Sequence, residues 1–443
     1  MVNYLYLIIG ISLSWSTYVS GYKNKMGFSC FSTNRSNFNL NENKENDDFL
    51  HWLSGFTDAE GNFLITIDRE YVKFRYKISL HIDDINVLHL IKSKLNIGRV
   101  TVDKNNNSCS FIVESYSDIK NVICPIFKSF PLHTSKKLDF ENFYEAVLIK
   151  NNNKLSDTDV EKIRSLKSSM NSKREVFTYS TSESQIIINP NWFIGFLEGE
   201  GTFGIKTGSS LYFQIAQKST SQESLNAITV LLTGLSNDDL KNSKISPMNV
   251  VSTVNTRTNV VSLVVSSVDS LYYYLLPLLD SSKMYTRKAV DFRLWILALL
   301  LKIHGYYYLP EGKKLFLDIS DILNKRYSTG SNGNSDGIIV NIFERSKSIL
   351  EKDPPFNVKA NKPHVENVRE YSSKNKSENP KIVYIYTDEG MIEGSPFVSF
   401  SAAHKALGLK SSSNTCNRYI DTSRLYKNKY IFSSKPIDRT SRK

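Results

Sequence analysis

Cysteine is scarce in this sequence. The chain has 443 residues and only four cysteines, at positions 30, 109, 124 and 416. None of the four lies close enough to another to give the paired spacing of a zinc knuckle or a redox motif. We therefore expect no disulfide framework and no structural zinc.

Acidic residues are few relative to basic ones. The chain has 44 Asp and Glu against 56 Lys and Arg, a net charge of +12, and its isoelectric point is near 9.2. This balance favours a polyanionic partner, with nucleic acid first and a membrane surface second. The hydrophobic share of 40% indicates a globular rather than a disordered protein. A chain of this length is expected to form two or three domains.

The N-terminus lacks the marks of the usual targeting segments. The stretch from Tyr4 to Val19 is apolar, but no basic residue precedes it and no small-residue cleavage pattern follows it. No arginine comes before Arg35, whereas a mitochondrial presequence is rich in arginine. Polar residues dominate positions 20–49, so we interpret residues 1–48 as an apolar segment followed by a linker.

An internal repeat follows this linker. The segment His51–Phe63 (HWLSGFTDAEGNF) aligns with Asn191–Phe203 (NWFIGFLEGEGTF), and Trp, Gly, Phe, Glu, Gly and Phe recur at matching places. The alignment continues, because Ile78, Leu88, Ile91 and Leu95 match Ile215, Leu225, Ile228 and Leu232, and Pro125, Thr134, Lys136, Asp139 and Phe140 match Pro277, Thr286, Lys288, Asp291 and Phe292. The repeat predicts two copies of one domain, at residues 49–190 and 191–330.

Each copy has the pattern of an α+β domain: helix, two strands, helix, two strands, helix. In the first copy Val72, Phe74, Tyr76, Ile78 and Leu80 alternate with polar and basic residues, as in a strand with one buried face. Lys73, Arg75 and Lys77 would then lie on the open face. Such a face is often only solvated. Because the protein is basic and the pattern is repeated, we predict DNA binding there, with Lys206 and Lys218 contributing from the second copy.

Small residues and glutamates coincide in the two motif segments. Gly55 and Ala59, and likewise Gly195 and Gly199, are four residues apart, so each pair lies on one stripe of a helix. If the two helices pack along these stripes, Glu60 and Glu200 come together at the centre of the molecule. Two hard oxygen ligands there suit Mg²⁺, which takes few protein carboxylates and can activate water against a phosphodiester. In the alternative interpretation the small residues only pack and the glutamates are solvated or cap helix ends.

The segments Leu53–Gly61 (LSGFTDAEG) and Phe193–Gly201 (FIGFLEGEG) resemble the two namesake motifs of LAGLIDADG homing endonucleases, in the monomeric form common in fungal mitochondrial introns. The resemblance implies an αββαββα fold in each half and paired sheets that form a saddle over double-stranded DNA. It also implies Mg²⁺ and catalysis at Glu60 and Glu200, and a mitochondrial location in which residues 1–20 are an exon remnant. Asp58 and Glu198 would support the helix pair.

Many members of this family supply a lysine from a late strand to polarise the attacking water. At the positions where we expect that lysine, this chain has Ser115 and Ser267. Lys218, at the end of a strand of the second copy, is the substitute that the sequence offers.

The remainder of the chain divides by composition. Residues 331–380 are rich in Lys, Asn, Glu, Pro and Ser and are expected to be a linker. Residues 381–443 resemble the first type of nuclease-associated modular domain, through Val383–Tyr386, Ser399–Leu409 and Tyr426–Phe432. The resemblance implies an additional DNA-binding arm, and the alternative is a small structural cap.

Two other functions use the same features. An RNA maturase would keep the fold and bind the host intron RNA to assist splicing; the intact Glu60 and Glu200 favour the nuclease, whereas Ser115 and Ser267 favour the maturase. A DNA-binding regulator without chemistry would not require two glutamates related by the repeat. The sequence therefore favours a site-specific, Mg²⁺-dependent DNA endonuclease that promotes the mobility of its intron.

Overall fold

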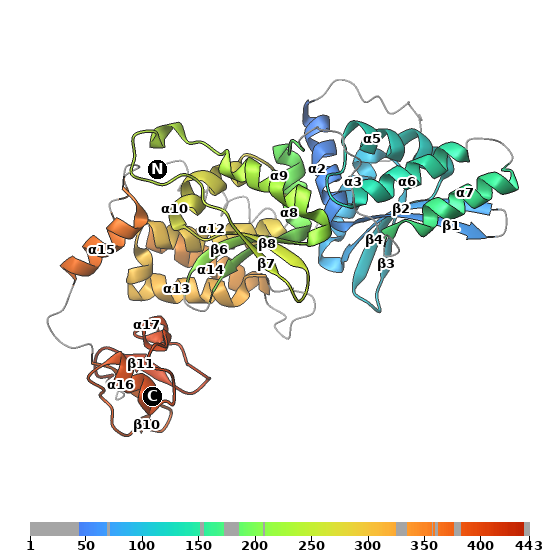
Figure 1. The fold of residues 1–443 in the computed structure, drawn as a ribbon. Helices are drawn as coiled ribbons and strands as arrows, with labels where there is room; N and C mark the ends of the chain where they lie inside the picture. Colours follow the sequence, from blue (N-terminus) through green and yellow to red (C-terminus); the bar gives the residue numbers. More distant parts are fainter. Residues whose placement is uncertain are drawn as a thin grey trace.

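The protein consists of two repeated α+β halves and a small C-terminal module (Figure 1). The structure is a computed structural model that describes residues 44–68, 71–150, 155–171, 186–206, 209–324, 335–356, 358, 362–375 and 382–437. The predicted apolar segment at residues 4–19 lies outside these residues. In the described part of the chain, no helix is long and apolar enough to cross a membrane.

The first half begins with helix α2, which starts at Lys44, inside the segment expected to be a linker. Its elements are α2 (Lys44–Glu60), β1 (Gly61–Asp68), β2 (Tyr71–His81), a 3-10 turn (Ile82–Asp84), α3 (Ile85–Leu95), β3 (Arg99–Asp103), β4 (Ser108–Val113), α4 (Tyr116–Asp118), a π-helical turn (Ile119–Ile123), α5 (Cys124–Ser129), α6 (Lys136–Ile149) and α7 (Asp157–Ser168). The four strands form an antiparallel sheet in the order β1-β2-β4-β3.

The second half repeats this arrangement. Its elements are α8 (Pro190–Glu200), β5 (Gly201–Ile205), β6 (Leu211–Lys218), a 3-10 turn (Ser219–Ser221), α9 (Gln222–Thr233), a 3-10 turn (Asp238–Leu240), β7 (Val251–Asn255), β8 (Val260–Val265), α10 (Val268–Ser270), a π-helical turn (Leu271–Leu275), α11 (Leu276–Asp280), α12 (Lys288–Ile303), a 3-10 turn (Tyr306–Tyr308) and α13 (Pro310–Ile322). The sheet order is β5-β6-β8-β7, which corresponds strand by strand to the first sheet. The predicted fold is confirmed in both halves.

The registers of the two sheets agree as well. Gly61 pairs with Ile78 in the first sheet, and Gly201 pairs with Ile215 in the second. Side chains alternate along β2 as the sequence predicts: Val72, Phe74, Tyr76 and Ile78 are buried under the helices, whereas Lys73 and Arg75 are exposed. One face of each sheet is therefore core, and the other is open.

The expectation of a linker over residues 331–380 is wrong for two segments. Residues Ser335–Leu350 form helix α14, which packs against α13, and His364–Lys374 form helix α15. Ile339, Ile342 and Phe343 of α14 are buried in the core of the second half. These positions have the i, i+3, i+4 spacing of an amphipathic helix, which the polar composition of the surrounding sequence concealed.

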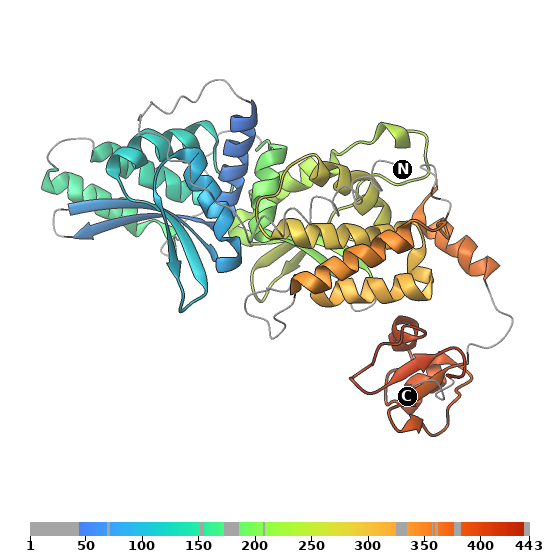
Figure 2. The same ribbon diagram turned by 180° about the vertical axis from the view of Figure 1, so that it is seen from behind.

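The C-terminal module has its own core. It contains β9 (Tyr384–Thr387), β10 (Gly390–Met391), α16 (Phe400–Ala406), α17 (Thr415–Tyr419) and β11 (Ile431–Ser433), with the strand order β10-β9-β11. Its buried residues form a separate cluster of Val383, Ile385, Ala403, Cys416 and Phe432. The module lies beside the second half in both views (Figures 1 and 2), where Arg424 forms ion pairs with Asp318 and Asp321 of the second half.

Helix α14 should stabilise the second half. Ile342 is 1% exposed and Ile338 of the same helix is 39% exposed. We expect Ile342→Ala to lower the free energy of unfolding by roughly 2 to 5 kcal/mol, because it leaves a cavity in the core. The same change at Ile338 should cost less than about 1 kcal/mol. Urea unfolding of the full chain measures both, and equal effects would contradict the packing of α14.

Candidate functional site

Helices α2 and α8 pack so closely that their backbones touch. A Cβ atom at Gly55 would overlap the carbonyl of Trp192, and one at Gly195 would overlap the carbonyl of Trp52. One turn further along, a Cβ at Gly199 would overlap Ala59. The four small residues predicted to form the helix-pair interface thus lie together along the contact between the halves.

A crossed pair of hydrogen bonds fixes the two helices against each other. Trp52 Nε1 donates to Glu198 at 2.6 Å, and Trp192 Nε1 donates to Asp58 at 3.0 Å. Both carboxylates are buried, at 4% exposure for Asp58 and 5% for Glu198. Each indole therefore reaches across the interface to an acid of the opposite half.

The same two acids also hold the segments that lead into α6 and α12. Asp58 accepts from the backbone N–H groups of His133 at 2.7 Å and Thr134 at 3.1 Å, and Glu198 accepts from those of Tyr285 at 2.9 Å and Thr286 at 2.5 Å. Burial raises the pKa of Asp58 and of Glu198, and these hydrogen bonds oppose the rise. Each acid thus connects its own motif helix to the opposite motif helix and to the segment before α6 or α12.

The motif helices end at the other two glutamates. Glu60 is the last residue of α2 and Glu200 the last of α8, and each is only partly buried. Burial raises the pKa of Glu200, while a hydrogen bond from Gln217 and the charges of Lys136 and Lys288 lower it. Because these helices are in contact up to Gly199 and Ala59, the two carboxylates lie in one central region.

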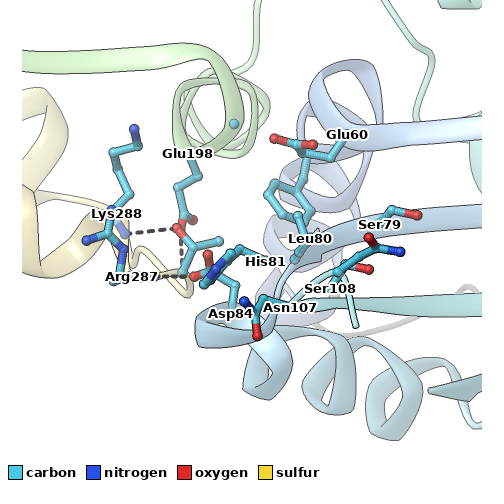
Figure 3. Close-up of a pocket in the computed structure, with 14 residues that line it drawn as sticks. Glu60, Ser79, Leu80, His81, Asp84, Asn107, Ser108, Glu198, Arg287 and Lys288 are labelled. Atoms are coloured by element: carbon cyan, nitrogen blue, oxygen red, sulfur yellow. Dashed lines mark hydrogen bonds between the residues drawn. The ribbon is translucent and has the colours of Figure 1, made fainter. Parts of the chain in front are cut away.

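A pocket of about 440 Å³ opens beside Glu60 between the two halves. Ser79, His81 and Asp84 line it from the first half, and Arg287 and Lys288 line it from the second. Figure 3 shows Glu60 on one side of this pocket and Lys288 on the other. Asp84 joins the halves here, because it accepts from the backbone N–H of Arg287 at 2.7 Å.

Two lysines, Lys136 and Lys288, lie beside the glutamates. Lys136 Nζ donates to the carbonyls of Thr57 at 3.0 Å and Ala59 at 2.9 Å, and Lys288 Nζ donates to the carbonyl of Gly201 at 2.7 Å. Burial lowers the pKa of both lysines; Asp58, Glu60 and Glu200 are among the charges that oppose this for Lys136. The cations thus lie at the ends of the motif helices.

Ser115 and Ser267, where a lysine from a late strand was expected, follow β4 and β8. Both serines begin short helices, where their hydroxyls accept from the N–H groups of Asp118 and Ser270. Lys218 is exposed at the end of β6. The lysines beside the glutamates are Lys136 and Lys288, and the internal repeat carried the signal for them, since it aligned these two residues.

The predicted basic face of the first sheet is present but partly neutralised. Lys73 and Arg75 are exposed on β2, and Lys77 is partly buried. Arg75 forms an ion pair with Glu114, which also binds Arg99. In the second half Lys206 is exposed just after β5, with its Nζ 5.5 Å from the centre of the Tyr212 ring.

Comparison with known proteins identifies the repeated halves. The family described as LAGLIDADG endonuclease matches residues 53–147 and 193–299. These two segments belong to the LAGLIDADG endonuclease family.

Proteins similar to this chain occur in fungi. An uncharacterized mitochondrial protein, RF1 of Saccharomyces cerevisiae, is 26% identical over 416 residues, which cover 90% of this chain and 84% of that protein. The probable intron-encoded endonuclease Cox1-I1b of Schizosaccharomyces pombe is 28% identical over 294 residues, which cover 64% of this chain and 71% of that protein.

Solved structures share the LAGLIDADG fold. The homing endonuclease I-GzeII, in complex with its DNA target, is 25% identical, and the match covers 62% of this chain and 98% of that chain with a TM-score of 0.52. I-LtrWI bound to target DNA is 20% identical, and the match covers 63% of this chain and 99% of that chain with a TM-score of 0.55. The paired αββαββα halves are therefore the architecture of this family.

The glycines of the helix pair should tolerate no side chain. We expect Gly195→Ala to lower the free energy of unfolding by roughly 1 to 3 kcal/mol or more, the cost of overpacking a core. The reason is that the new Cβ meets the rigid carbonyl of Trp52. Gly234→Ala is the control, because this glycine lies outside the helix pair and a Cβ there would meet the carbonyl of Val230 in its own helix α9, at 3.0 Å. Urea unfolding compares them. A Gly195→Ala protein as stable as the control would contradict the close contact.

Proposed function

We propose that this protein is a homing endonuclease that cuts both strands of a specific double-stranded DNA site. The observation that carries the proposal is the pair Glu60 and Glu200, which end two helices in contact and lie beside Lys136 and Lys288. The repeat relates one glutamate and one lysine of each half to those of the other. Two equivalent sites of this kind suit two cuts, one for each strand, and relatives named as intron-encoded endonucleases support this chemistry.

The ends of the motif helices fit a divalent cation. Among the residues that the structure describes, no cluster of three or more His, Cys, Asp or Glu side chains could enclose a metal. Glu60 and Glu200 supply oxygen ligands without such an enclosure, which suits Mg²⁺ because it keeps several waters and takes phosphate oxygens as ligands. When bound there, Mg²⁺ would supply a Lewis acid and lower the pKa of a water molecule.

We propose that the two lysines supply positive charge for the scissile phosphate and orient the attacking water. The Lys136 and Lys288 ammonium groups are held at carbonyls at the ends of the motif helices, next to the glutamates. From there each can attract the scissile phosphate and orient the attacking water by donating a hydrogen bond. This role replaces the one expected for a lysine from a late strand.

The open faces of the two sheets are the proposed DNA surface. They lie on either side of the helix pair, and the net charge of +12 favours a polyanion. Lys73, Arg75 and Lys77 would contact the first half of the site, and Lys206 and Lys218 the second. Because one chain supplies both halves, the protein needs no partner copy and is expected to act as a monomer.

We propose a mitochondrial location, since the relatives RF1 and Cox1-I1b come from fungi and RF1 is named as mitochondrial. The maturase alternative was argued from the lack of lysines at Ser115 and Ser267. Lys136 and Lys288 occupy the place beside the glutamates instead. Binding of the host intron RNA stays a prediction of the sequence alone.

Each glutamate should be required for cleavage. We expect Glu60→Gln and Glu200→Gln to reduce cleavage in Mg²⁺ by about 100-fold or more, because each removes a charged metal ligand, while DNA binding is kept. The assay is linearisation of a supercoiled plasmid that carries a site selected by the wild-type protein. One of the two variants should accumulate nicked circles in this assay. Glu141→Gln, an exposed change of equal charge on α6, is the control. Two variants that linearise the plasmid at the wild-type rate would contradict the assignment.

The C-terminal module is proposed to be an additional DNA arm. Ending the chain at Asn375 removes the module and keeps α14 and α15 whole. We expect the shortened protein to bind DNA more weakly and to protect a shorter footprint, because fewer phosphates are contacted. The cut positions should not change. An identical footprint and affinity would mean that the module serves another partner.

A further inference from the structure

The open faces of the two sheets differ in chemistry although their backbones correspond. The first sheet carries seven charged side chains on this face: Asp68, Lys73, Arg75, Lys77, Arg99, Asp103 and Glu114. On and directly beside the described strands of the second sheet, the equivalent face has two charged side chains, Lys218 and Lys206. The contrast is confined to the side chains, since the strand order and registers are shared.

An ion-pair fork crosses the first sheet. Glu114 follows β4 and binds Arg75 of β2 at 2.5 Å and Arg99 of β3 at 2.6 Å. The two arginine side chains remain 48% and 54% exposed, so they are oriented without being buried. We call Arg75, Arg99 and Glu114 the arginine fork. It has a net charge of one and presents planar donors in a fixed geometry.

The second sheet has neutral residues at each position of the fork. By the strand registers, Tyr212 corresponds to Arg75, Val251 to Arg99 and Ser266 to Glu114. The neighbouring Lys77 corresponds to Gln214, whose side-chain amide donates to Ser262 at 3.3 Å. Val251 is 45% exposed, which leaves its methyl groups accessible on this face.

These groups recognise different bases in the major groove. An arginine makes two hydrogen bonds to O6 and N7 of guanine, whereas methyl groups contact the methyl group of thymine and an amide such as Gln214 pairs with adenine. We propose that the two halves read half-sites of different base composition: the arginine fork reads guanine in the first half-site, and the neutral residues at the equivalent positions of the second sheet read an A·T-rich half-site. This inference rests on the proposed DNA-cutting function.

The position of the fork predicts where the guanine lies. Arg75 is three residues along β2 from Ile78, which pairs with Gly61, the residue after Glu60. At the rise of a strand this places Arg75 roughly 10 Å from the end of the motif helix. Because successive base pairs are about 3.4 Å apart, the guanine should lie about three or more base pairs from the centre of the cuts.

The test is selection of binding sites from random duplex DNA with the full-length protein. We expect the wild-type protein to enrich sites with a guanine on one side of the centre and A·T pairs on the other. Arg75→Ala and Arg99→Ala should each lower the guanine preference at one position of the first half-site by roughly ten-fold. Preferences in the second half-site should not change.

Two further variants separate base reading from charge and folding. Lys73→Ala removes a positive charge from the same strand face outside the fork, and it should weaken binding to all sequences and reduce the salt slope by about one. The triple variant Arg75→Tyr, Arg99→Val and Glu114→Ser gives the first sheet the residues of the second. It should shift the first half-site towards A·T, and its thermal unfolding shows whether it is folded.

The outcomes distinguish this inference from the proposed function. If the wild-type protein enriches specific sites and cuts them, but both half-sites have the same guanine content, the inference is wrong and the nuclease proposal stands. Unchanged guanine preference in Arg75→Ala and Arg99→Ala also overturns it. If the wild-type protein enriches no sequence at all, the proposed function and the inference both fail.

Discussion

The backbone contact between α2 and α8 is the constraint on which the remaining structure depends. Gly55 and Gly195 allow each helix to reach the carbonyls of the other, and any side chain at either position would separate the halves. This approach brings Trp52 within hydrogen-bond distance of Glu198 and Trp192 within that of Asp58. It also brings the two helix ends, and with them Glu60 and Glu200, into one region.

The two acids of each motif have different surroundings. Asp58 and Glu198 are buried and surrounded by N–H and hydroxyl donors, so their charge is used in holding the fold together. Glu60 and Glu200 are partly exposed and lie near two partly buried lysines, Lys136 and Lys288. In each motif, two positions thus separate a buried structural carboxylate from the one that we propose as a metal ligand.

Much of this arrangement could be predicted from local patterns, and the rest depends on distant contacts. The spacing of Gly55, Ala59 and Glu60, and its repetition, indicated the helix pair, and the alternation along β2 indicated its open face. Lys136 was not assigned to the site because it reaches Ala59 from 77 positions away in the chain. The ion pairs of Glu114 depend on strand register, and α14 was concealed by its polar surroundings.

We propose that the helix pair presents Glu60 and Glu200 as two equivalent metal ligands. Anomalous diffraction from crystals of the full-length protein with its selected DNA duplex and Mn²⁺ tests this most directly. We expect metal peaks next to the carboxylates of Glu60 and Glu200, on either side of the contact between α2 and α8. Metal bound at Asp58 and Glu198, or at neither pair of acids, would contradict it.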